Sequence, residues 1–204
     1  MRTLSDILNT IGDQCTGDTI SMDDLLKAFH ERGFGFFLFL FSLPAALPLP
    51  AVGVGTVLGL PLVFLTAQQA IGRRTIWFPE KFKNKSLKRA RVLAMIDRAL
   101  PWTQRVEKFI KPRMEFVTLG IFSRLIGVFG FIMALSVLVP LPLTNTVPSF
   151  GIALMSIGVI MRDGLAVIAG ALIGMIWVCA LIMIVLFLGT EGFDIIKDLI
   201  KSYI

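Results

Sequence analysis

The chain has 204 residues, 55% of them hydrophobic, and its mean hydropathy of +0.81 lies well above the range of soluble domains. No charge interrupts residues 33–72 or 164–190, and Arg124 is the single charge between residues 116 and 161. A helix crosses a bilayer core with about 20 apolar residues. This pattern excludes an ordinary soluble enzyme and predicts an all-α integral membrane protein with several membrane segments.

Residues 1–32 form the first predicted segment, which is amphipathic and cytoplasmic. The aspartates of this segment and its lack of an apolar run argue against a cleaved signal peptide. Ser21 followed by Asp24 resembles a capping box, so we expect a surface helix after it. Cys15 lies in a polar stretch and Cys179 in an apolar one, so we expect no disulfide between them. No Cys/His cluster predicts a metal site.

Residues 33–72 are predicted to form a helical hairpin with a Leu-Pro-Leu-Pro tip. Fifteen residues, 33–47, precede Pro48, and they give about 22 Å of helix at ~1.5 Å per residue, short of a ~30 Å core. Pro48 and Pro50 then stop the helix. The returning limb is about as long as a full span. We therefore expect a re-entrant hairpin with its tip inside the membrane; two full crossings with a short external turn are the alternative.

The following linker, residues 73–115, is strongly basic. Between Gly72 and Arg113, thirteen Lys and Arg stand against three acidic residues, a net charge of +10. Such a segment is expected on the cytoplasmic side, against anionic lipid. Nucleic-acid binding is less favoured, because the linker is tethered between membrane segments. Apolar and basic residues at helical spacing predict helices lying on the membrane surface. The predicted interfacial residues are Arg73, Trp77, Trp102, Arg105, Lys111 and Arg113.

Residues 116–164 repeat the first hairpin. A shift of residues 32–72 by 92 positions gives eleven identities, among them one Arg, two Pro and three Gly. Shared apolar composition explains matches of Phe and Leu, but not these. The second tip therefore carries Pro140 and Pro142, and both hairpins are expected to open to the cytoplasm, unless the protein inserts in two orientations.

The last apolar run is predicted to cross the membrane once, and an interfacial amphipathic helix follows it. The predicted order is residues 1–32 as the N-terminal cytoplasmic amphipathic segment, 33–72 as the first hairpin repeat, 73–115 as the basic linker with interfacial helices, 116–164 as the second hairpin repeat, 165–189 as a transmembrane helix and 190–204 as a C-terminal amphipathic helix.

Polar residues inside or beside the apolar runs form the candidate intramembrane site. Arg124 either faces a cavity or extends to the membrane edge. Asn145 either satisfies backbone groups at the second hairpin tip or binds a ligand. For each of these two residues, the sequence leaves both alternatives open.

Two further pairs belong to this candidate site. Gln68 and Gln69 either join the hairpins through amide hydrogen bonds or line a pathway. Arg162 and Asp163 are expected to end the second hairpin and to pair locally.

Several ordered motifs resemble one known family. They are R-G-F-G at 32–35, G-L-P-L at 59–62, Gln68, G-R at 72–73, W-F-P at 77–79, Arg105, Glu107, K-P-R at 111–113, P-L-P-L-T-N-T-V-P at 140–148 and R-D-G at 162–164. The chain resembles the exopolysaccharide synthesis proteins called ExoD over nearly its whole length. Phe78 departs from the Leu expected in the W-L-P pattern. The resemblance implies a bacterial inner-membrane protein associated with exopolysaccharide production, without supplying a mechanism.

The expected function is a non-enzymatic transport or permeability component. The hairpins would meet tip to tip, with Asn145, Gln68 and Arg124 facing a shared interior. The alternative is a scaffold that binds lipid or a polysaccharide-biosynthesis partner through the basic linker. No acid/base pair or nucleophile is placed for catalysis, so no catalytic residue and no cofactor are expected. The expected partners are membrane lipids, a second copy of the chain and a polysaccharide-biosynthesis protein, and not nucleic acid.

Overall fold

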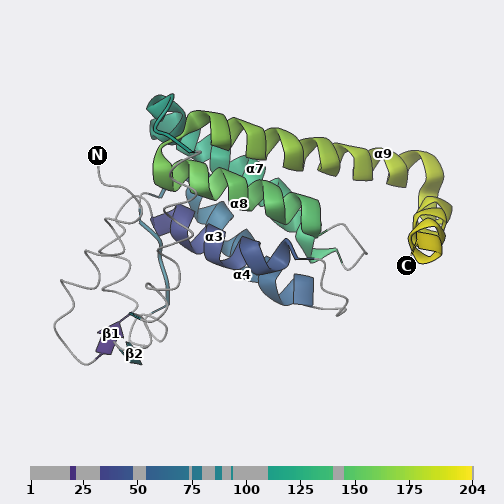
Figure 1. The fold of residues 1–204 in the computed structure, drawn as a ribbon, viewed down its shortest axis with the longest axis horizontal. Coiled ribbons are helices and arrows are strands. Elements are labelled where there is room, and N and C mark those ends of the chain that lie inside the picture. Colours follow the sequence, from purple (N-terminus) through teal and green to yellow (C-terminus); the bar gives the residue numbers. More distant parts are fainter. Residues whose placement is uncertain are drawn as a thin grey trace.

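Five α-helices make up most of the described part of the chain (Figure 1). The computed structural model describes residues 19–21, 33–47, 54–73, 75–79, 86–88, 93, 110–139 and 145–203. The helices are α3 (Gly33–Ala45), α4 (Val54–Ala70), α7 (Gly120–Leu138), α8 (Thr146–Met161) and α9 (Gly164–Tyr203), with the 3-10 helix η2 (Glu115–Thr118) before α7.

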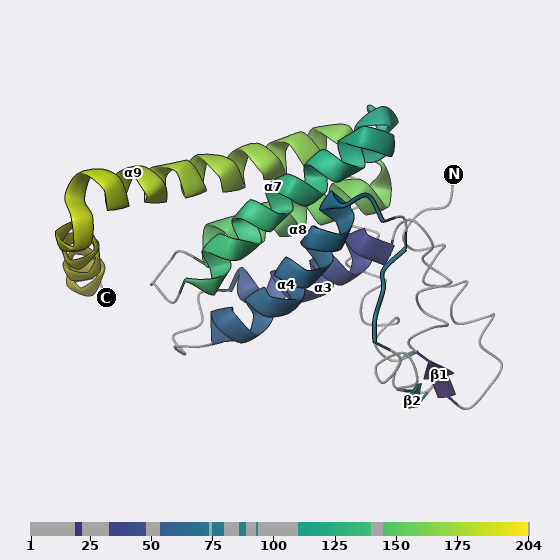
Figure 2. The same ribbon diagram turned by 180° about the vertical axis from the view of Figure 1, so that it is seen from behind.

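The helix boundaries follow the apolar runs closely. The first hairpin consists of α3 and α4, and the second of α7 and α8. Helix α7 begins at Gly120, because the first residues of the predicted second hairpin (116–164) belong to η2 instead. Helix α9 is a single element of 40 residues, which covers both the predicted crossing and the predicted C-terminal helix and bends near its far end (Figures 1 and 2).

The two hairpins lie side by side, and each helix of one packs along a helix of the other. Helix α4 runs along α7 and α3 runs along α8, while α9 covers α8. Figure 2 shows α4 beside α7 on the back of the bundle. The expected tip-to-tip meeting of the hairpins is therefore wrong. The core between them is apolar, and Leu62, Leu65 and Met133 are fully buried in it.

Two glycines allow the hairpins to approach this closely. A Cβ at Gly127 of α7 would collide with the backbone of Gln69 and Ala70 in α4. A Cβ at Gly35 of α3 would lie 2.9 Å from the carbonyl oxygen of Ser156 in α8. Small residues at such crossings let helix backbones come together, as in membrane helix pairs.

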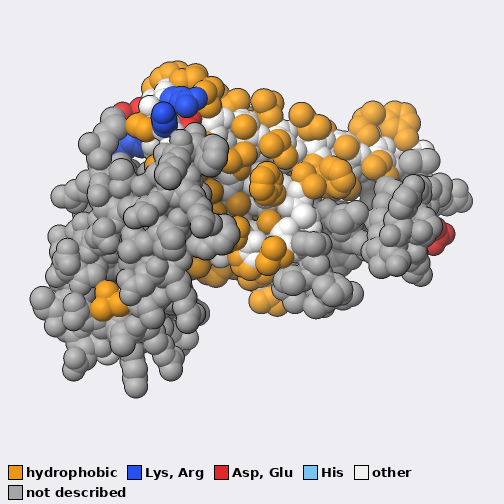
Figure 3. Space-filling model, viewed as in Figure 1, with side chains coloured by type: hydrophobic (Ala, Val, Ile, Leu, Met, Phe, Trp, Pro, Cys, Tyr) orange, Lys and Arg blue, Asp and Glu red, His pale blue; other side chains and the backbone are white. Residues whose placement is uncertain are grey.

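The outer surface of the helices is largely apolar. Leu172, Ile176 and Phe187 of α9 are exposed, as are Ile121 and Leu125 of α7. Figure 3 shows hydrophobic side chains along α9 and the helical body, and charged side chains near η2. Within the described ranges, α7 and the 164–184 part of α9 are long and apolar enough to cross a membrane. Only 22% of that part of α9 is buried, whereas a core helix of a soluble protein would be mostly buried.

A short two-stranded antiparallel sheet joins the N-terminal segment to the linker. It pairs β1 (Thr19–Ser21) with β2 (Ser86–Lys88), with Ile20 opposite Leu87. Ser21, which the sequence suggests as a helix cap, is the last residue of β1. The tip residues Pro48, Pro50, Pro140 and Pro142 and the linker residues Trp102 and Arg105 lie outside the described residues.

Candidate functional site

The C-terminal end of α4 forms one side of the candidate site. The N–H of Gly72 donates to the carbonyl of Gln69 at 2.9 Å, and the N–H of Arg73 donates to that of Gln68 at 3.1 Å. This pattern is a Schellman motif. Gly72 has φ +87°, a conformation that glycine adopts without penalty. The turn directs the chain out of the helix at Arg73.

Helix α8 ends in the same motif, but with an arginine in the left-handed position. The N–H of Asp163 donates to Gly158 O at 2.8 Å, and that of Arg162 to Val159 O at 3.4 Å. Arg162 has φ 56°, which disfavours it against glycine by about 1–2 kcal/mol. The predicted repeat pairs Gly72 with Gly164, yet Gly164 is the first residue of α9. The left-handed position is therefore shifted in the second hairpin.

These helix ends surround a cavity of 510 Å³ together with the N-terminal turn of α7. It lies at the open ends of both hairpins, opposite their tips. Three of its lining residues are arginines. The first N–H groups of any helix have no partner within the helix. Helix α7 begins at the cavity without a side-chain cap and without an acidic residue in its first turn. The lining residues are Phe34, Gln69, Gly72, Arg73, Thr118, Leu119, Gly120, Ile121, Ser123, Arg124, Val159 and Arg162.

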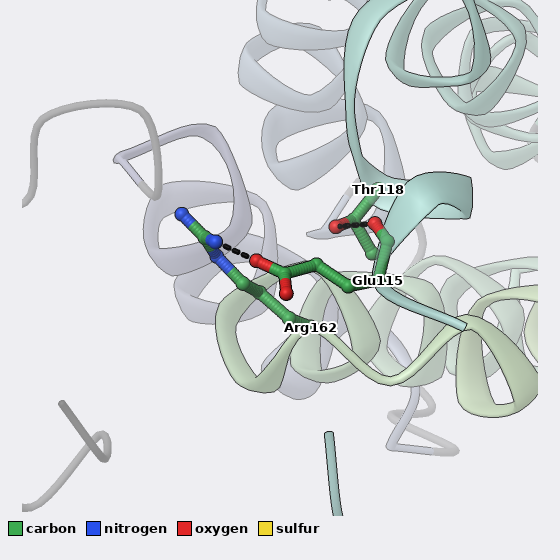
Figure 4. A network of polar contacts seen from close by, with 3 residues as sticks. All are labelled: Glu115, Thr118 and Arg162. Atoms are coloured by element: carbon green, nitrogen blue, oxygen red, sulfur yellow. Dashed lines mark hydrogen bonds and ion pairs between the residues drawn. The ribbon is translucent and has the colours of Figure 1, made fainter. Parts of the chain in front are cut away.

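Arg162 is held by an ion pair. Its guanidinium pairs with the Glu115 carboxylate of η2 (Figure 4). The hydroxyl of Thr118 donates to the backbone carbonyl of Glu115 at 2.7 Å and closes the short helix. The two charged side chains are about a third exposed, at 31% and 30%, so the pair contributes at most about 1 kcal/mol to stability. Its main effect is to fix the place of Arg162 at the cavity.

Arg124 lies against the end of α4. Its guanidinium occupies the space directly beside Gly72, which any larger residue would fill. A cation at the C-terminal end of a helix interacts favourably with the helix dipole. Among the described residues, neither Arg124 nor Arg73 pairs with a carboxylate. The structure thus brings together three arginines that the sequence places in separate regions.

The two neighbouring glutamines have different surroundings. The side-chain amide of Gln68 makes two hydrogen bonds with the backbone of Trp77. The Trp77 N–H donates to Oε1 at 2.7 Å, and Nε2 donates to the Trp77 carbonyl at 3.2 Å. Gln69 lines the cavity, where its Nε2 makes one long contact of 3.5 Å with the Ser123 hydroxyl. The Gln69 side chain is buried, yet its Oε1 has no hydrogen-bond partner among the described residues.

Comparison with known proteins places the chain in a family. The family model described as exopolysaccharide synthesis, ExoD, matches residues 4–183. The chain belongs to the ExoD family. It is 28% identical to Protein ExoD of Rhizobium meliloti over 83% of this chain and 72% of that protein. An uncharacterized protein from Synechocystis sp. is 35% identical over 91% of this chain and 89% of its own length. No solved structure matches.

In this ExoD family member, the expected shared interior of Asn145, Gln68 and Arg124 does not form. Asn145 precedes α8 at the tip end, and its carbonyl accepts from Ser149 N–H at 3.1 Å. Helix α8 separates it from the cavity by 16 residues, or about 24 Å. Asp163 is turned to α9, where its Oδ1 accepts from Leu165 N–H at 3.0 Å and caps the helix.

Several of the motifs that carry the resemblance have structural roles at this end of the bundle. Gln68 and W-F-P meet in the paired amide contact, and G-R forms the Schellman turn. In R-D-G, Arg162 lines the cavity and Asp163 caps α9. Sequence reasoning missed Thr118, Ser123 and Phe34 as cavity residues. Only the short polar interruption of an apolar run could have indicated Ser123. Of the predicted interfacial residues, Arg73, Trp77, Lys111 and Arg113 are exposed.

Proposed function

We propose that this ExoD family member is a non-enzymatic transport or permeability component of the bacterial inner membrane that supports exopolysaccharide synthesis. The family relation supports the link to exopolysaccharide. The observation that carries transport is the cavity between the two hairpins, lined by side chains from α3, α4, α7 and α8. Binding sites between helices of bundles commonly hold small ligands.

The apolar outer surface supports a membrane location. An exposed apolar surface of this extent is unfavourable in water but favourable against lipid chains. In the proposed placement, α9 crosses the bilayer, and the charged end near η2 lies at the cytoplasmic surface with the basic linker. The 73–115 linker then stays on the side where positive charge is retained.

We also propose that the two hairpins are copies of one re-entrant unit. Adding 92 to Val54, the first residue of α4, gives Thr146, the first residue of α8. The packing is reciprocal, because α3 meets α8 and α4 meets α7. Helix α3 has 13 residues and is about 20 Å long, too short to cross a ~30 Å core. Its tip would therefore lie within the membrane.

In this proposal, the substrate binds in the cavity from the cytoplasmic side. The packed core around Leu62 and Met133 closes the path between the hairpins toward the tips. Passage then requires the two hairpins to move relative to each other. A small sliding of packed helices, as in transporters, would open such a path. The glycine crossings at Gly35 and Gly127 are the places where the hairpins hold together.

Reconstitution into liposomes tests the proposal. Liposomes with the purified chain would be assayed for leak of protons and potassium and for translocation of a fluorescent phospholipid quenched from outside by dithionite. Wild type is expected to accelerate at least one of these over empty liposomes. Ser123→Leu, which fills the cavity, should abolish the flux. The matched change Ser136→Leu on the same helix, outside the cavity lining, should leave it intact.

The outcome also separates transport from a scaffold function. If no flux appears with correctly folded protein in the vesicles, transport is rejected. A scaffold that binds lipid or a biosynthetic partner through the 73–115 linker would then be the better reading, and vesicle binding would depend on the linker lysines and arginines. If both serine variants lose flux equally, the cavity is not the pathway.

A further inference from the structure

We propose that the cavity binds a phosphate group carried by a lipid, with Arg73, Arg124 and Arg162 and the first turn of α7 as its ligands. This deepens the proposed function by naming the substrate class, and it rests on that proposal. The ligand would be an amphiphile with an anionic phosphate headgroup.

The positive charge of the cavity is the first argument for phosphate binding. Three guanidinium groups line it. Of the two described carboxylates beside Arg162, Glu115 pairs with Arg162 and Asp163 caps α9. Guanidinium groups bind phosphate oxygens through two parallel N–H donors, more effectively than ammonium groups do. Arg73 and Arg124 come from opposite hairpins, so one phosphate between them would join the two halves of the bundle.

The N-terminus of α7 adds backbone donors. Its first turn holds Gly120 and Ile121 at the cavity, and no side chain caps it. Uncapped helix N-termini favour phosphate through their free N–H groups and the helix dipole. Gly120 has φ +59° and open space where a Cβ would stand, so the backbone is accessible there.

Gln69 gives an independent indication of a ligand. It is 2% exposed, lines the cavity, and its Oε1 lacks a partner among the described residues. A buried polar atom left without a hydrogen bond destabilises the fold. Turning the amide by 180° would give Oε1 to the Ser123 hydroxyl and leave the NH₂ group without a partner instead. In both orientations one polar atom of the amide lacks a hydrogen-bond partner. A headgroup hydroxyl or a phosphate oxygen could supply it.

The apolar side of the cavity points to a lipid rather than to free phosphate. Leu119 and Ile121 line it and are 41% and 69% exposed. Along α7 the exposed apolar surface continues through Phe122 and Leu125. An acyl chain lying on this surface would leave its phosphate at the arginines. A soluble phosphate would make no use of these side chains.

Ligand-induced thermal stabilisation of the full chain in detergent tests the inference. The probes are inorganic phosphate, dihexanoyl phosphatidic acid and dihexanoyl glycerol, which is the same lipid without phosphate. Phosphatidic acid is expected to stabilise the wild type at the lowest concentration, and dihexanoyl glycerol not at all. Arg124→Gln and Arg73→Gln should each weaken the apparent affinity about tenfold or more. Arg113→Gln, an exposed arginine outside the cavity lining, serves as the matched control.

Arg162→Gly keeps the test independent of folding. Glycine suits the φ of 56° at this position, so the variant should fold while losing phosphatidic acid binding. Equal stabilisation by dihexanoyl glycerol, or an equal loss in Arg113→Gln, would overturn the phosphate site. Equal affinity for inorganic phosphate would overturn the lipid assignment. Binding without flux in liposomes rejects the transport proposal alone. Flux that survives Arg124→Gln with binding lost rejects the assignment of the phosphate lipid as the transported substrate.

Discussion

The side-chain amide of Gln68 holds the backbone of Trp77 at both its N–H and its carbonyl, at 2.7 and 3.2 Å. The contact fixes the segment of chain that runs from the end of α4 into the basic linker. The Trp77 ring lies tilted against Phe64 of the same helix, with the centroids 6.3 Å apart, and is half exposed. Gln68 therefore positions an aromatic side chain at the surface where the bundle meets the linker.

Substitution of the two adjacent glutamines by methionine should have opposite results. Gln68→Met leaves the Trp77 backbone without its partners, so the free energy of unfolding should fall by about 1–3 kcal/mol. Gln69→Met removes a buried amide with an unpartnered oxygen, so it should be neutral or stabilising. Thermal unfolding in detergent measures both, with about 2–4 °C expected per kcal/mol in a chain of this size. An equal loss in both variants would contradict the different roles assigned to them.

Gly127→Ala should destabilise the bundle. The new methyl group would collide with the backbone of α4 at Gln69 and Ala70, which cannot move without moving the whole helix. The expected loss is about 2 kcal/mol or more, despite the better helix propensity of alanine.

Gly59→Ala is the matched control for that change. Its methyl group would meet the end of the Leu138 side chain at 2.9 Å, and a side chain can rotate away. Because alanine improves helix propensity by about 1 kcal/mol, the variant should be as stable as the wild type or more so. Similar melting temperatures for the two alanine variants would refute close backbone packing at Gly127.

The helices could be predicted from the sequence because uninterrupted apolar runs, prolines and glycines mark them. Which helix packs along which could not be predicted. Whether α4 lies along α7 or meets it tip to tip depends on side-chain packing, and both arrangements satisfy the same hydropathy pattern. The cavity followed from this pairing, since it alone brings Arg73 and Arg162 beside Arg124.

The separate roles of Gln68 and Gln69 were equally hidden from the sequence. Successive helix residues point about 100° apart, so one amide reaches Trp77 and the other the cavity. Which of the two does so depends on the rotation of α4 in the bundle. Asn145 was expected at the tip of the second hairpin, and it does lie at that end of α8, away from Arg124.

Asp163→Ala should cost about 0.5–2 kcal/mol of stability, because Asp163 caps α9. Its Oδ1 accepts from the N–H groups of Leu165 and Ala166, at 3.0 and 3.3 Å. Asp163→Asn keeps an oxygen in the same place and should lose only a few tenths of a kcal/mol. Melting temperatures in detergent distinguish the two. If Asp163→Asn is as unstable as Asp163→Ala, the carboxylate charge matters rather than the cap.

Cys179 reports directly on the membrane location of α9. It is exposed on the apolar outer surface of this helix, so in water it would be accessible. An impermeant maleimide carries charge and does not enter the hydrocarbon region of a membrane. In a Cys15→Ser background, an impermeant maleimide should therefore leave Cys179 unlabelled in membranes and label it after denaturation in detergent. Labelling in intact membranes would place this surface in water and contradict the crossing.

Two introduced cysteines test the topology of the hairpins and the linker together. In a background without Cys15 and Cys179, Lys111→Cys should react with the impermeant reagent in inverted vesicles and not in intact cells, because the basic linker is expected to be cytoplasmic. The second change, Leu47→Cys, lies just after α3 in the first hairpin, where Leu47 is 56% exposed.

The position of Leu47 separates a re-entrant hairpin from two full crossings. If α3 is too short to reach the far surface, Leu47→Cys stays unlabelled from either side until the membrane is dissolved. Two full crossings would place it in the periplasm, where intact cells would label it efficiently. Labelling of Lys111→Cys from the periplasm would instead reverse the whole orientation. Labelling of it from both sides would show that the chain inserts in two orientations.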